Sequence, residues 1–517
     1  MTKLTRLLGP STRRFLVAVV WGFINTALFA VLSPLALKYL FDEGIAKQNF
    51  RLFIAVGVGS LVAFTVLRVS ELLYNLFAQR LKNIVLGRTV FKMLRSYFSF
   101  PYREILRRGE GYFVSRIYDE SKSATEPVTD TVLGVVQATA MITGGGVIVL
   151  ALSWQLTAVV AAVTFVLLYE SSVFGRRILR QSSVEQEEEA RLRAIVTDMT
   201  GAYKTARMFN LVERGMTAVA TQLEPFQSVL YERFKTAKKY NTLSGIFLSW
   251  AELAVVIGGG YAVLVGSMTF GGFMAFMNAY WVAVNGLRQL VESIPALSQL
   301  GASIDRVLEF EGQVVGSRHP DLVSTDGTIR LEHIDFKYDD KPVLNDFSVQ
   351  VHEGERVMLV GSNGSGKSTV ANIIAGFLQP DSGNMQLPRT ISAVVEPVSF
   401  PPVPLEAMLP EEKREEALRL AAAFEIDDHL SRRHDDLSLG QRRKWAVLMA
   451  LLKPAQCYVL DEPLANLDGK SRSLVIDIIF ERTRGKTLIA IMHEGEEFAD
   501  RFDRVVQMPA VEAQGSA

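Results

Sequence analysis

The chain has 517 residues, of which 49% are hydrophobic and 21% are charged, with 55 basic and 55 acidic side chains. That length exceeds what one hydrophobic core usually supports, and the composition excludes a disordered chain. The balanced charge gives no argument for nucleic-acid binding, so we expect no nucleic-acid partner. A single cysteine, Cys457, excludes an intramolecular disulfide framework and a cysteine-rich metal site.

Long runs without Asp, Glu, Lys or Arg fill much of the first 310 residues. They cover residues 15–37, 52–67, 131–169 and 253–287. A helix needs about 20 apolar residues to cross a bilayer, so each of the two longest runs predicts two spans. We expect breaks at 153–155 and 266–272, and six transmembrane helices in all. Buried helices of a soluble protein are disfavoured, because the runs lack a polar stripe at the 3.6-residue period.

The distribution of Lys and Arg predicts the orientation in the membrane. Four precede the first span, eleven lie within residues 68–130, and twelve lie within residues 170–239. The turns after the third and fifth spans contain none. Because positive residues concentrate on the cytoplasmic side, both termini and the two long loops are expected there. We expect an integral protein of a bacterial inner membrane, with helices that continue beyond the lipid as cytoplasmic extensions.

The composition changes near residue 312. Residues 312–327 are polar and rich in turn formers, which predicts a linker, and residues 511–517 are expected to be a tail. Between them, residues 328–510 alternate short apolar runs with helical patterns, which favours a soluble α/β domain. The predicted domains are therefore a transmembrane domain over 1–311 and an α/β domain over 328–510.

The α/β domain contains a phosphate-binding loop motif. The motif follows a strand-like apolar run and opens a helical run, and it consists of Gly361, Ser362, Asn363, Gly364, Ser365, Gly366, Lys367, Ser368 and Thr369. Glycines let successive backbone N–H groups face phosphate oxygens. Lys367 is expected to supply a positive charge to the phosphates, and Ser368 a hydroxyl ligand to Mg²⁺.

A pair of acidic residues follows another buried-strand pattern, at 457–460. Asp461 and Glu462 can divide two roles that phosphoryl transfer requires. One carboxylate holds Mg²⁺, and the other orients or deprotonates the attacking water. An acidic pair alone is a weak signal, because many strands end in solvated acids.

Three further motifs accompany the acidic pair. They are Leu-Ser-Leu-Gly-Gln at 437–441, Leu-Asp at 467–468, and His493 after an apolar run. With these motifs the sequence resembles the ATP-binding cassette (ABC) transporters, and in particular the half-transporter exporters, over nearly the whole chain. The resemblance implies six transmembrane helices fused to one P-loop nucleotide-binding domain. It also implies ATP hydrolysis coupled to transport, with ATP and Mg²⁺ as cofactors.

The resemblance also assigns roles to individual residues. It implies that Tyr338 stacks on adenine, that Asp461 ends the Walker B motif, that Glu462 is the catalytic carboxylate, and that His493 contacts the γ-phosphate. The signature motif residues Ser438, Gly440 and Gln441 would complete the site of a second subunit. For Tyr338 and His493, a purely structural role remains the alternative.

The sequence departs from the family pattern at three points. Leu439 stands in the signature motif where glycine is common, and Glu396 stands nearest the position of an expected glutamine. A carboxylate there could keep a contact to Mg²⁺ or water, but it cannot donate hydrogen bonds. Only 40 residues separate Glu396 from Leu437, which predicts a short helical subdomain. These features resemble the cyclic-peptide and siderophore exporter branch.

One phosphate loop and one signature motif per chain predict a dimer, and the intact Glu462 and His493 favour a homodimer. Glu252 interrupts an apolar helix, so it is expected to face a substrate cavity or a neighbouring helix. Asn278 and Asn285 are weaker cavity candidates.

The expected function is ATP-driven export of a peptide-like, siderophore or other amphipathic compound by alternating access. A siderophore importer, or a multidrug or lipid exporter, of the same fold remains an alternative. An ATP-regulated membrane protein without transport is a third hypothesis.

Overall fold

A computed structural model of the chain describes residues 2–312, 327–492 and 496–509. The chain divides into two compact units. The first comprises residues 1–97 and 114–313, and the second comprises residues 98–113 and 314–517. The second unit therefore includes a short segment that precedes most of the first unit in the sequence. His493 and nearly all of the predicted linker lie outside the described residues.

Long helices form the first unit, as the apolar runs predict. Six of those that the structure describes have 28 residues or more: α2 (Thr12–Tyr39), α3 (Phe50–Tyr97), α6 (Ser121–Leu152), α7 (Trp154–Gly201), α9 (Val212–Leu264) and α10 (Phe270–Gly312). Shorter elements are α1 (Thr2–Leu8), η1 (Gly9–Ser11), η2 (Leu40–Ile45), η3 (Ser115–Glu120) and α8 (Tyr203–Met208). Within the described residues, four stretches are long and apolar enough to cross a membrane: Lys3–Ile45, Phe50–Tyr97, Glu110–Leu152 and Val212–Leu264.

Both predicted breaks are confirmed, and each is capped. Ser153 separates α6 from α7 with an extended backbone, and its Oγ accepts a hydrogen bond from the N–H of Leu156 at 3.4 Å. Between α9 and α10, the Asp42 carboxylate accepts from Thr269 Oγ1 at 2.7 Å and from the Gly271 N–H at 2.9 Å. Such side-chain caps satisfy N–H groups that a helix start leaves without partners.

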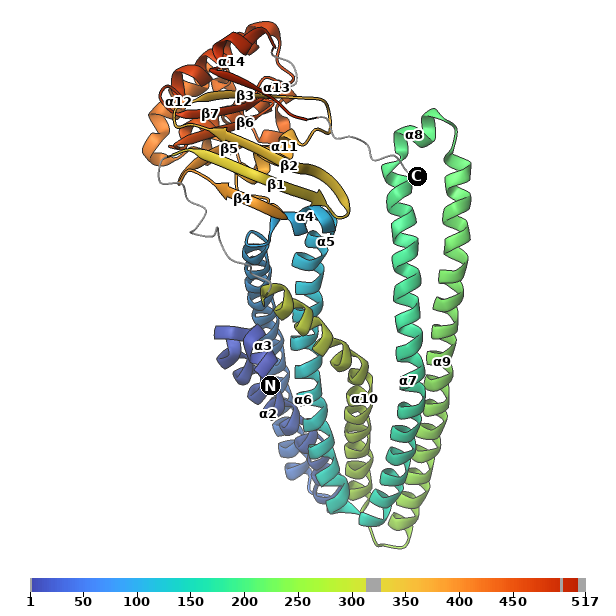
Figure 1. Ribbon diagram of the computed structural model, residues 1–517. Coiled ribbons are helices and arrows are strands. Elements are labelled where there is room, and N and C mark those ends of the chain that lie inside the picture. Colours follow the sequence, from blue (N-terminus) through green and yellow to red (C-terminus); the bar gives the residue numbers. More distant parts are fainter. Residues whose placement is uncertain (1, 313–326, 493–495, 510–517) are drawn as a thin grey trace. The chain divides into compact units, whose positions relative to one another are not determined.

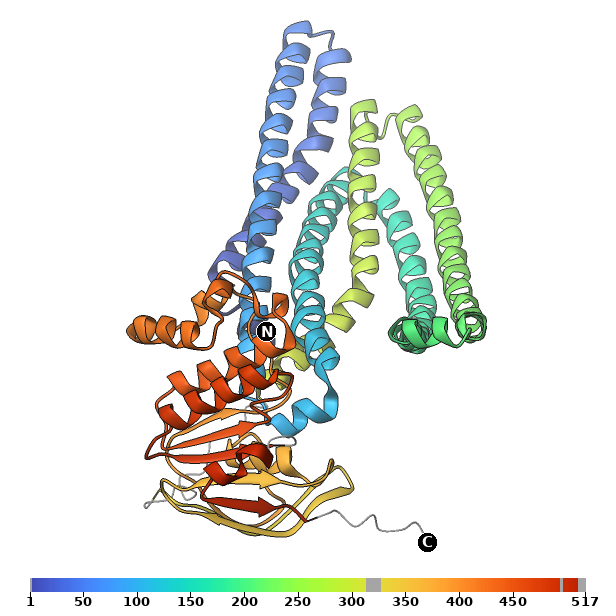
Figure 2. The ribbon, with the colours of Figure 1, turned by 90° about the horizontal axis from the view of Figure 1, so that it is seen from above.

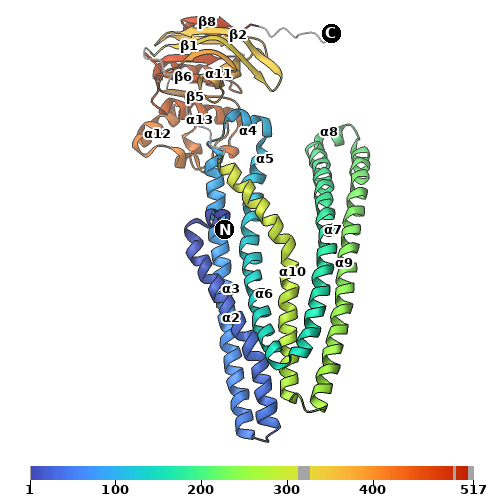
Figure 3. The same cartoon turned by 60° about the horizontal axis from the view of Figure 1, so that its bottom comes forward.

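Small residues bring the helices of the first unit close together. A Cβ at Gly145 of α6 would lie 2.8 Å from the Ala279 carbonyl oxygen of α10, and one at Gly144 would lie 2.9 Å from Ala30 of α2. Glycine at these positions lets α2, α6 and α10 pack closely, as is common in membranes. Helix α7 packs along α9, and the two run side by side in Figures 1 and 3.

Several helices are longer than a bilayer requires. Helix α9 has 53 residues, which at 1.5 Å per residue is about 80 Å, against a hydrocarbon core of about 30 Å. Helices α3 and α7 have 48 residues each. This confirms the expectation that the helices continue past their apolar runs.

The second unit contains two sheets. An antiparallel sheet has the order β2-β1-β4, with β1 (Ile329–Tyr338), β2 (Lys341–Val351) and β4 (Ser382–Gln386). A parallel sheet has the order β5-β6-β7-β3-β8, with β3 (Arg356–Val360), β5 (Ile391–Val394), β6 (Cys457–Asp461), β7 (Thr487–Ile491) and β8 (Arg504–Gln507). The helices are α4 (Tyr102–Arg108), α11 (Lys367–Ile374), α12 (Arg414–Ala423), α13 (Leu439–Leu452) and α14 (Gly469–Arg482), with α5 (Glu110–Val114) at the boundary between the units. Short 3₁₀ turns are η5 (Leu405–Met408), η6 (Glu411–Lys413), η7 (Asp427–His429), η8 (His434–Asp436) and η9 (Glu496–Arg501).

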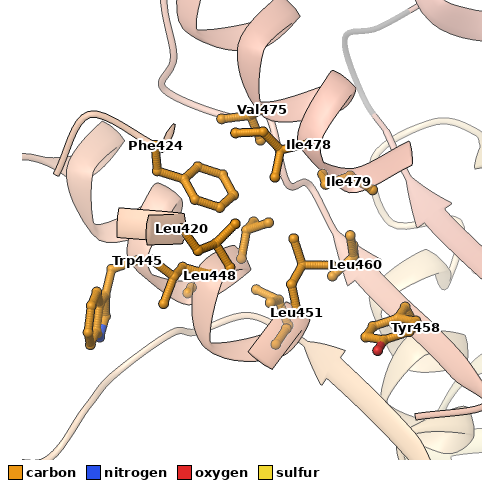
Figure 4. Close-up of a cluster of buried hydrophobic side chains, with 14 of the residues drawn as sticks. Leu420, Phe424, Trp445, Leu448, Leu451, Tyr458, Leu460, Val475, Ile478 and Ile479 are labelled. Atoms are coloured by element: carbon orange, nitrogen blue, oxygen red, sulfur yellow. The ribbon is translucent and has the colours of Figure 1, made fainter. Parts of the chain in front are cut away.

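Two hydrophobic clusters pack on opposite faces of the parallel sheet. Successive residues of β6 alternate between them: Tyr458 and Leu460 belong to one cluster, and Cys457 and Val459 to the other. This alternation follows from the two-residue period of a strand, and burial on both faces explains why the run is apolar throughout. The first cluster gathers side chains of α12, α13 and α14, including Phe424 (Figure 4), and these orange and red helices lie together in Figure 2. The second cluster packs α11 and the antiparallel sheet.

Candidate nucleotide-binding site

The phosphate loop connects β3 to α11 and has the conformation that its glycines allow. Gly364 and Gly366 have φ of +82° and +90°, in the left-handed region that other residues rarely adopt. A Cβ at Gly366 would lie 2.7 Å from Leu344. The loop therefore needs glycine at Gly366 for both its dihedral angle and its space.

Lys367 begins α11 and folds back over the loop. Its Nζ donates to the carbonyl oxygens of Gly361 at 2.7 Å and Ser362 at 2.9 Å, and the side chain is buried. The ammonium group is thus held at the loop whose N–H groups would face phosphate oxygens. A fixed cation beside those N–H groups is suited to binding a polyphosphate.

Asp461 ends β6 and is almost completely buried, with 1% of the residue exposed. Apart from the nearby Ser368 hydroxyl, the carboxylate oxygens of Asp461 meet no hydrogen-bond donor among the described residues. Burial raises its pKa, and the nearby carboxylates of Glu462 and Glu396 raise it further, against the opposing effects of Ser368 and Arg443. A buried carboxylate with no basic partner is costly to leave charged, so Asp461 is suited to bind a cation, and Asp461 and the Ser368 hydroxyl together offer oxygen donors of the kind that Mg²⁺ prefers.

Glu462 follows directly, with a φ of +50° that is unusual for a residue other than glycine. Its N–H donates to the Ile491 carbonyl oxygen at 2.9 Å, which fixes this conformation at the end of β7. The residue lines a cleft of about 540 Å³. The cleft is bounded by Asn363, Glu462, Leu464, Ala465, Asn466, Arg472 and Met492. A residue of the phosphate loop and the expected catalytic carboxylate thus face one solvent-accessible space.

The signature motif forms the N-terminal cap of α13. Ser438 Oγ accepts from the Gln441 N–H at 3.3 Å, and Gln441 Oε1 accepts from the Ser438 N–H at 3.0 Å. This reciprocal pair is a capping box. Leu439 is 64% exposed, and within the described residues no hydrogen bond joins Ser438 to the phosphate loop. The exposed cap leaves this end of α13 accessible to another molecule.

Gly440 and Asp468 have local structural roles. A Cβ at Gly440 would lie 2.9 Å from the Asn466 carbonyl oxygen, so glycine allows α13 to approach the segment that lines the cleft. Asp468 caps α14, because its Oδ1 accepts from the Ser471 N–H at 3.0 Å. These hydrogen bonds lower the pKa of Asp468.

Tyr338 lies at the end of β1 and contacts Phe336 edge-to-face, with ring centroids 4.9 Å apart. It is partly buried against the cluster that packs the antiparallel sheet. This contact is compatible with either the nucleotide-stacking role or the packing role expected from the sequence.

Glu396 follows β5, the neighbour of β6 in the sheet. Its Oε2 accepts from the Val398 N–H at 3.2 Å, and its Oε1 forms an ion pair with Nη2 of Arg443. Arg443 lies on α13 and is buried, with 8% exposed. The sequence analysis assigned Arg443 no site role. The basic run that follows the signature motif at 442–444 is the available signal, and it does not identify Glu396 as the partner.

The segment 98–113 packs within the second unit, and sequence reasoning did not identify its contacts. Arg103 on α4 donates to Asp381 Oδ1 at 2.7 Å and to the Lys337 carbonyl oxygen at 2.8 Å. Tyr102 contacts Phe377 with ring centroids 5.7 Å apart. Partial burial raises the pKa of the Asp381 carboxyl group, but hydrogen bonds from Arg103 and from the Lys337 N–H outweigh this effect and hold the pKa below its ordinary value.

The expected cavity residues lie on two helices of the first unit. Glu252 on α9 is partly buried. Asn278 on α10 accepts a hydrogen bond from Ser33 of α2 at 3.0 Å, whereas Asn285 is exposed. In the described part of the chain, no hydrogen bond or ion pair joins Glu252 to either asparagine.

Comparisons with known proteins agree with both units. The family model described as the ABC transporter transmembrane region matches residues 15–284, more than half of the chain, and the ABC transporter model matches residues 344–465. The second range contains the phosphate loop, Asp461, Glu462 and the signature motif.

Curated relatives are about 25% identical in sequence to this chain over the aligned regions. The ABC-type oligopeptide transporter ABCB9 of Mus musculus is 25% identical, over 93% of this chain and 67% of the relative. The ATP-dependent lipid A-core flippase of Syntrophus aciditrophicus is 24% identical, over 99% of this chain and 90% of the relative. The sophorolipid transporter of Starmerella bombicola is 25% identical, over 77% of this chain and 34% of the relative.

A membrane region and an ATP-binding region thus occur once each in this chain, and both match one family over most of their length. The phosphate loop, the buried Asp461 and Glu462, which lines the adjoining cleft, all lie within the range that the ABC transporter model matches. The chain belongs to the ABC transporter family, as an integral membrane ATPase with the architecture of a half-transporter exporter.

Proposed function

We propose that two copies of the chain form a homodimer that exports an amphipathic compound from the cytoplasm. One observation carries the dimer: the exposed signature cap at Ser438 has no described hydrogen bond to the phosphate loop of its own chain. A nucleotide bound at Lys367 would therefore be left open on one side. A second copy, presenting its own exposed cap, would complete the site by symmetry.

Within each half-site the side chains divide the chemistry. Lys367 and the loop N–H groups hold the phosphates, and Glu462 orients a water against the γ-phosphorus and accepts its proton. The bond between the γ-phosphorus and the bridging oxygen breaks, which yields ADP and phosphate. His493 is proposed to contact the γ-phosphate and Tyr338 the adenine.

Ser368 and Asp461 are the residues that would hold Mg²⁺, with Glu396 close enough to influence the site. When bound, the ion neutralises charge on the phosphates. Asp461 is suited to this role because its two buried oxygens have no other described partner.

Transport requires that nucleotide binding favour one membrane conformation over another. Closure of two nucleotide-binding units around ATP would bias the helices toward an outward-open cavity, and hydrolysis would release the pair. The proposed cavity contains Glu252, Asn278 and Asn285. Among these, Asn278 already bonds to Ser33, so Glu252 is the strongest candidate for binding a cationic group.

The relatives support an amphipathic substrate. Their names specify an oligopeptide, a lipid A-core and a sophorolipid, all of which combine polar and apolar parts. We propose a substrate of this class for the present chain. We further propose a bacterial inner membrane as its location, because the lipid A-core flippases match nearly the whole chain.

A complementation experiment tests the dimer. Lys367→Met disables the phosphate loop, and Ser438→Asp retains a good helix cap while it places a negative charge against the partner's phosphate. Each variant alone should hydrolyse no ATP. Dimers assembled from equal amounts of the two chains contain one intact composite site in half of the molecules, so ATP hydrolysis should return to about a quarter of the wild-type rate. A mixture as inactive as its components would overturn the composite site.

The assigned base has its own test. Glu462→Gln should lower the ATPase rate by at least about 100-fold while it leaves nucleotide binding intact, because only proton transfer is lost. Glu481→Gln, at an exposed acid of α14, is the matched control and should hydrolyse ATP normally. Normal turnover by Glu462→Gln would exclude this residue as the base. ATP-driven uptake of substrate into inside-out rather than right-side-out vesicles would establish export.

A further inference from the structure

An arginine of the signature helix reaches the acidic end of the parallel sheet. Arg443 lies on α13, five residues after Ser438, and its guanidinium group points at two strands. Nη1 donates to the Asp461 carbonyl oxygen at 3.3 Å, and Nη2 pairs with Oε1 of Glu396. Arg443 is buried, with 8% exposed, whereas the Glu396 side chain is 38% exposed, so water screens the ion pair in part.

Both carboxylate oxygens of Glu396 have a partner, but only one of them is Arg443. Oε1 faces Arg443, and Oε2 accepts from the Val398 N–H at 3.2 Å. Asp461 differs, because among the described residues no basic side chain forms an ion pair with its carboxylate and its nearby partner is the Ser368 hydroxyl. The two acids beside the phosphate loop are therefore not equivalent: Asp461 is available to a cation, whereas Glu396 is already neutralised and held.

We propose that Arg443 is a positioning residue that restrains Glu396 and compensates its charge, so that Glu396 acts on the magnesium site through its charge rather than as a ligand. This inference rests on the proposed function, because it assumes that Ser368 and Asp461 hold Mg²⁺ with bound nucleotide. The four charged groups Glu396, Asp461, Glu462 and Arg443 then sum to a net charge of about −2, beside the positive charge of Lys367 on the phosphate loop.

The proposal gives α13 a role at two sites. Its exposed N-terminus carries Ser438, which in the proposed dimer faces the partner's nucleotide. Just over one turn later, Arg443 contacts the acidic residues beside this chain's own nucleotide. A displacement of α13 would therefore move Arg443 and change its ion pair with Glu396.

The test measures how strongly Mg²⁺ favours nucleotide binding. The dissociation constant of the full-length protein for a non-hydrolysable ATP analogue is measured in EDTA and in saturating Mg²⁺. The value in EDTA divided by the value in Mg²⁺ is the ratio that is compared among variants. Arg443→Met makes the site more negative, so the ratio should rise on the order of tenfold. Glu396→Gln makes the site less negative, so the ratio should fall by a similar factor. The double variant restores the charge and should lie within about twofold of wild type.

Two further variants separate charge from packing. Arg443→Lys keeps the positive charge and should stay within about twofold of the wild-type ratio, even if its thermal midpoint falls. Arg442→Met is the matched control, because the described hydrogen bonds of Arg442 go to the carbonyl oxygens of Leu437 and Asp435 on the same helix end. Its ratio should not change.

Each alternative result has a distinct meaning. If both single variants lower the ratio and the double variant is no worse, Glu396 is a direct ligand and charge compensation is wrong. If the ratio is unchanged in every variant while the thermal midpoint falls, the ion pair is a structural tie and the proposal is overturned. If the wild-type protein binds no nucleotide with Mg²⁺, the proposed function fails instead.

Discussion

The two units use apolar side chains in opposite ways. On α3 and α6 of the first unit, Leu61 and Leu150 are 68% and 60% exposed. In the second unit, Phe424 and Val459 are completely buried in clusters on the two faces of the sheet. The difference reflects the solvent around each unit, because lipid is as apolar as leucine whereas water is not.

The comparison shows that different forces hold the two units together. Burial of apolar area stabilises the second unit, as in any water-soluble domain. The first unit gains little free energy from moving apolar side chains out of lipid, so close packing of small residues stabilises the contacts between its helices. Gly144 and Gly145 provide such contacts between α6 and its neighbours.

The largest expected difference is between the stability lost when a buried phenylalanine of the second unit is truncated and that lost when an exposed leucine of the first unit is truncated. Phe424→Ala empties a buried position between α12 and α14 and should lower the free energy of unfolding of the second unit by about 3–5 kcal/mol. Leu61→Ala removes an exposed side chain of α3 and should change stability by less than about 1 kcal/mol. Thermal unfolding in lipid nanodiscs measures both. A loss for Leu61→Ala as large as that for Phe424→Ala would break the comparison.

A smaller effect is expected at neighbouring glycines of α6. A Cβ at Gly145 would lie 2.8 Å from the Ala279 carbonyl oxygen, so Gly145→Ala should force α6 and α10 apart and cost about 1–3 kcal/mol. Gly146 is the matched control, because a Cβ there meets nothing within 4 Å. Gly146→Ala should be neutral or slightly stabilising in the same unfolding measurement. Equal losses at both positions would contradict a packing role specific to Gly145.

The smallest effect concerns the segment 98–113. Arg103 and Asp381 are partly exposed, so their ion pair should hold α4 by no more than about 1 kcal/mol. The pKa of Asp381 is lowered in the folded protein, so this contribution is present above the unfolded pKa near 3.9 and is lost as pH falls through the folded value. Hydrogen exchange of residues 98–113 should therefore accelerate slightly in Arg103→Gln at neutral pH. The difference from wild type should shrink in acid to the part that the Arg103 hydrogen bond to the Lys337 carbonyl oxygen contributes, and a difference that does not change with pH would exclude a contribution from the Asp381 charge.

Much of the architecture could be predicted from local patterns. The apolar runs indicated the breaks at Ser153 and before Phe270, because each of these two runs is too long for a single crossing of the bilayer. The phosphate loop was evident from its glycines and Lys367. The expected fourth and sixth spans correspond to α7 and α10, which are not among the four stretches found in the described residues, so these two spans stay predictions. The roles of Tyr338 and His493 also stay predictions.

The contacts between distant segments could not be predicted in the same way. Glu396 and Arg443 are 47 positions apart, and nothing in either local sequence identifies the other as its partner. The same holds for Arg103 and Asp381, which chain order alone would assign to different units. Such pairs depend on which strands and helices become neighbours.

The amino-acid sequence by itself determined where the chain meets lipid and where it can bind phosphate. Both depend on short-range properties, namely the length of apolar runs and the conformational freedom of glycine. Only the tertiary structure decided that Asp461 has no ion pair among the described residues while Glu396 pairs with Arg443. That distinction depends on the order of strands in the sheet and on the face of α13 that packs against it, because charge interactions act through space rather than along the chain.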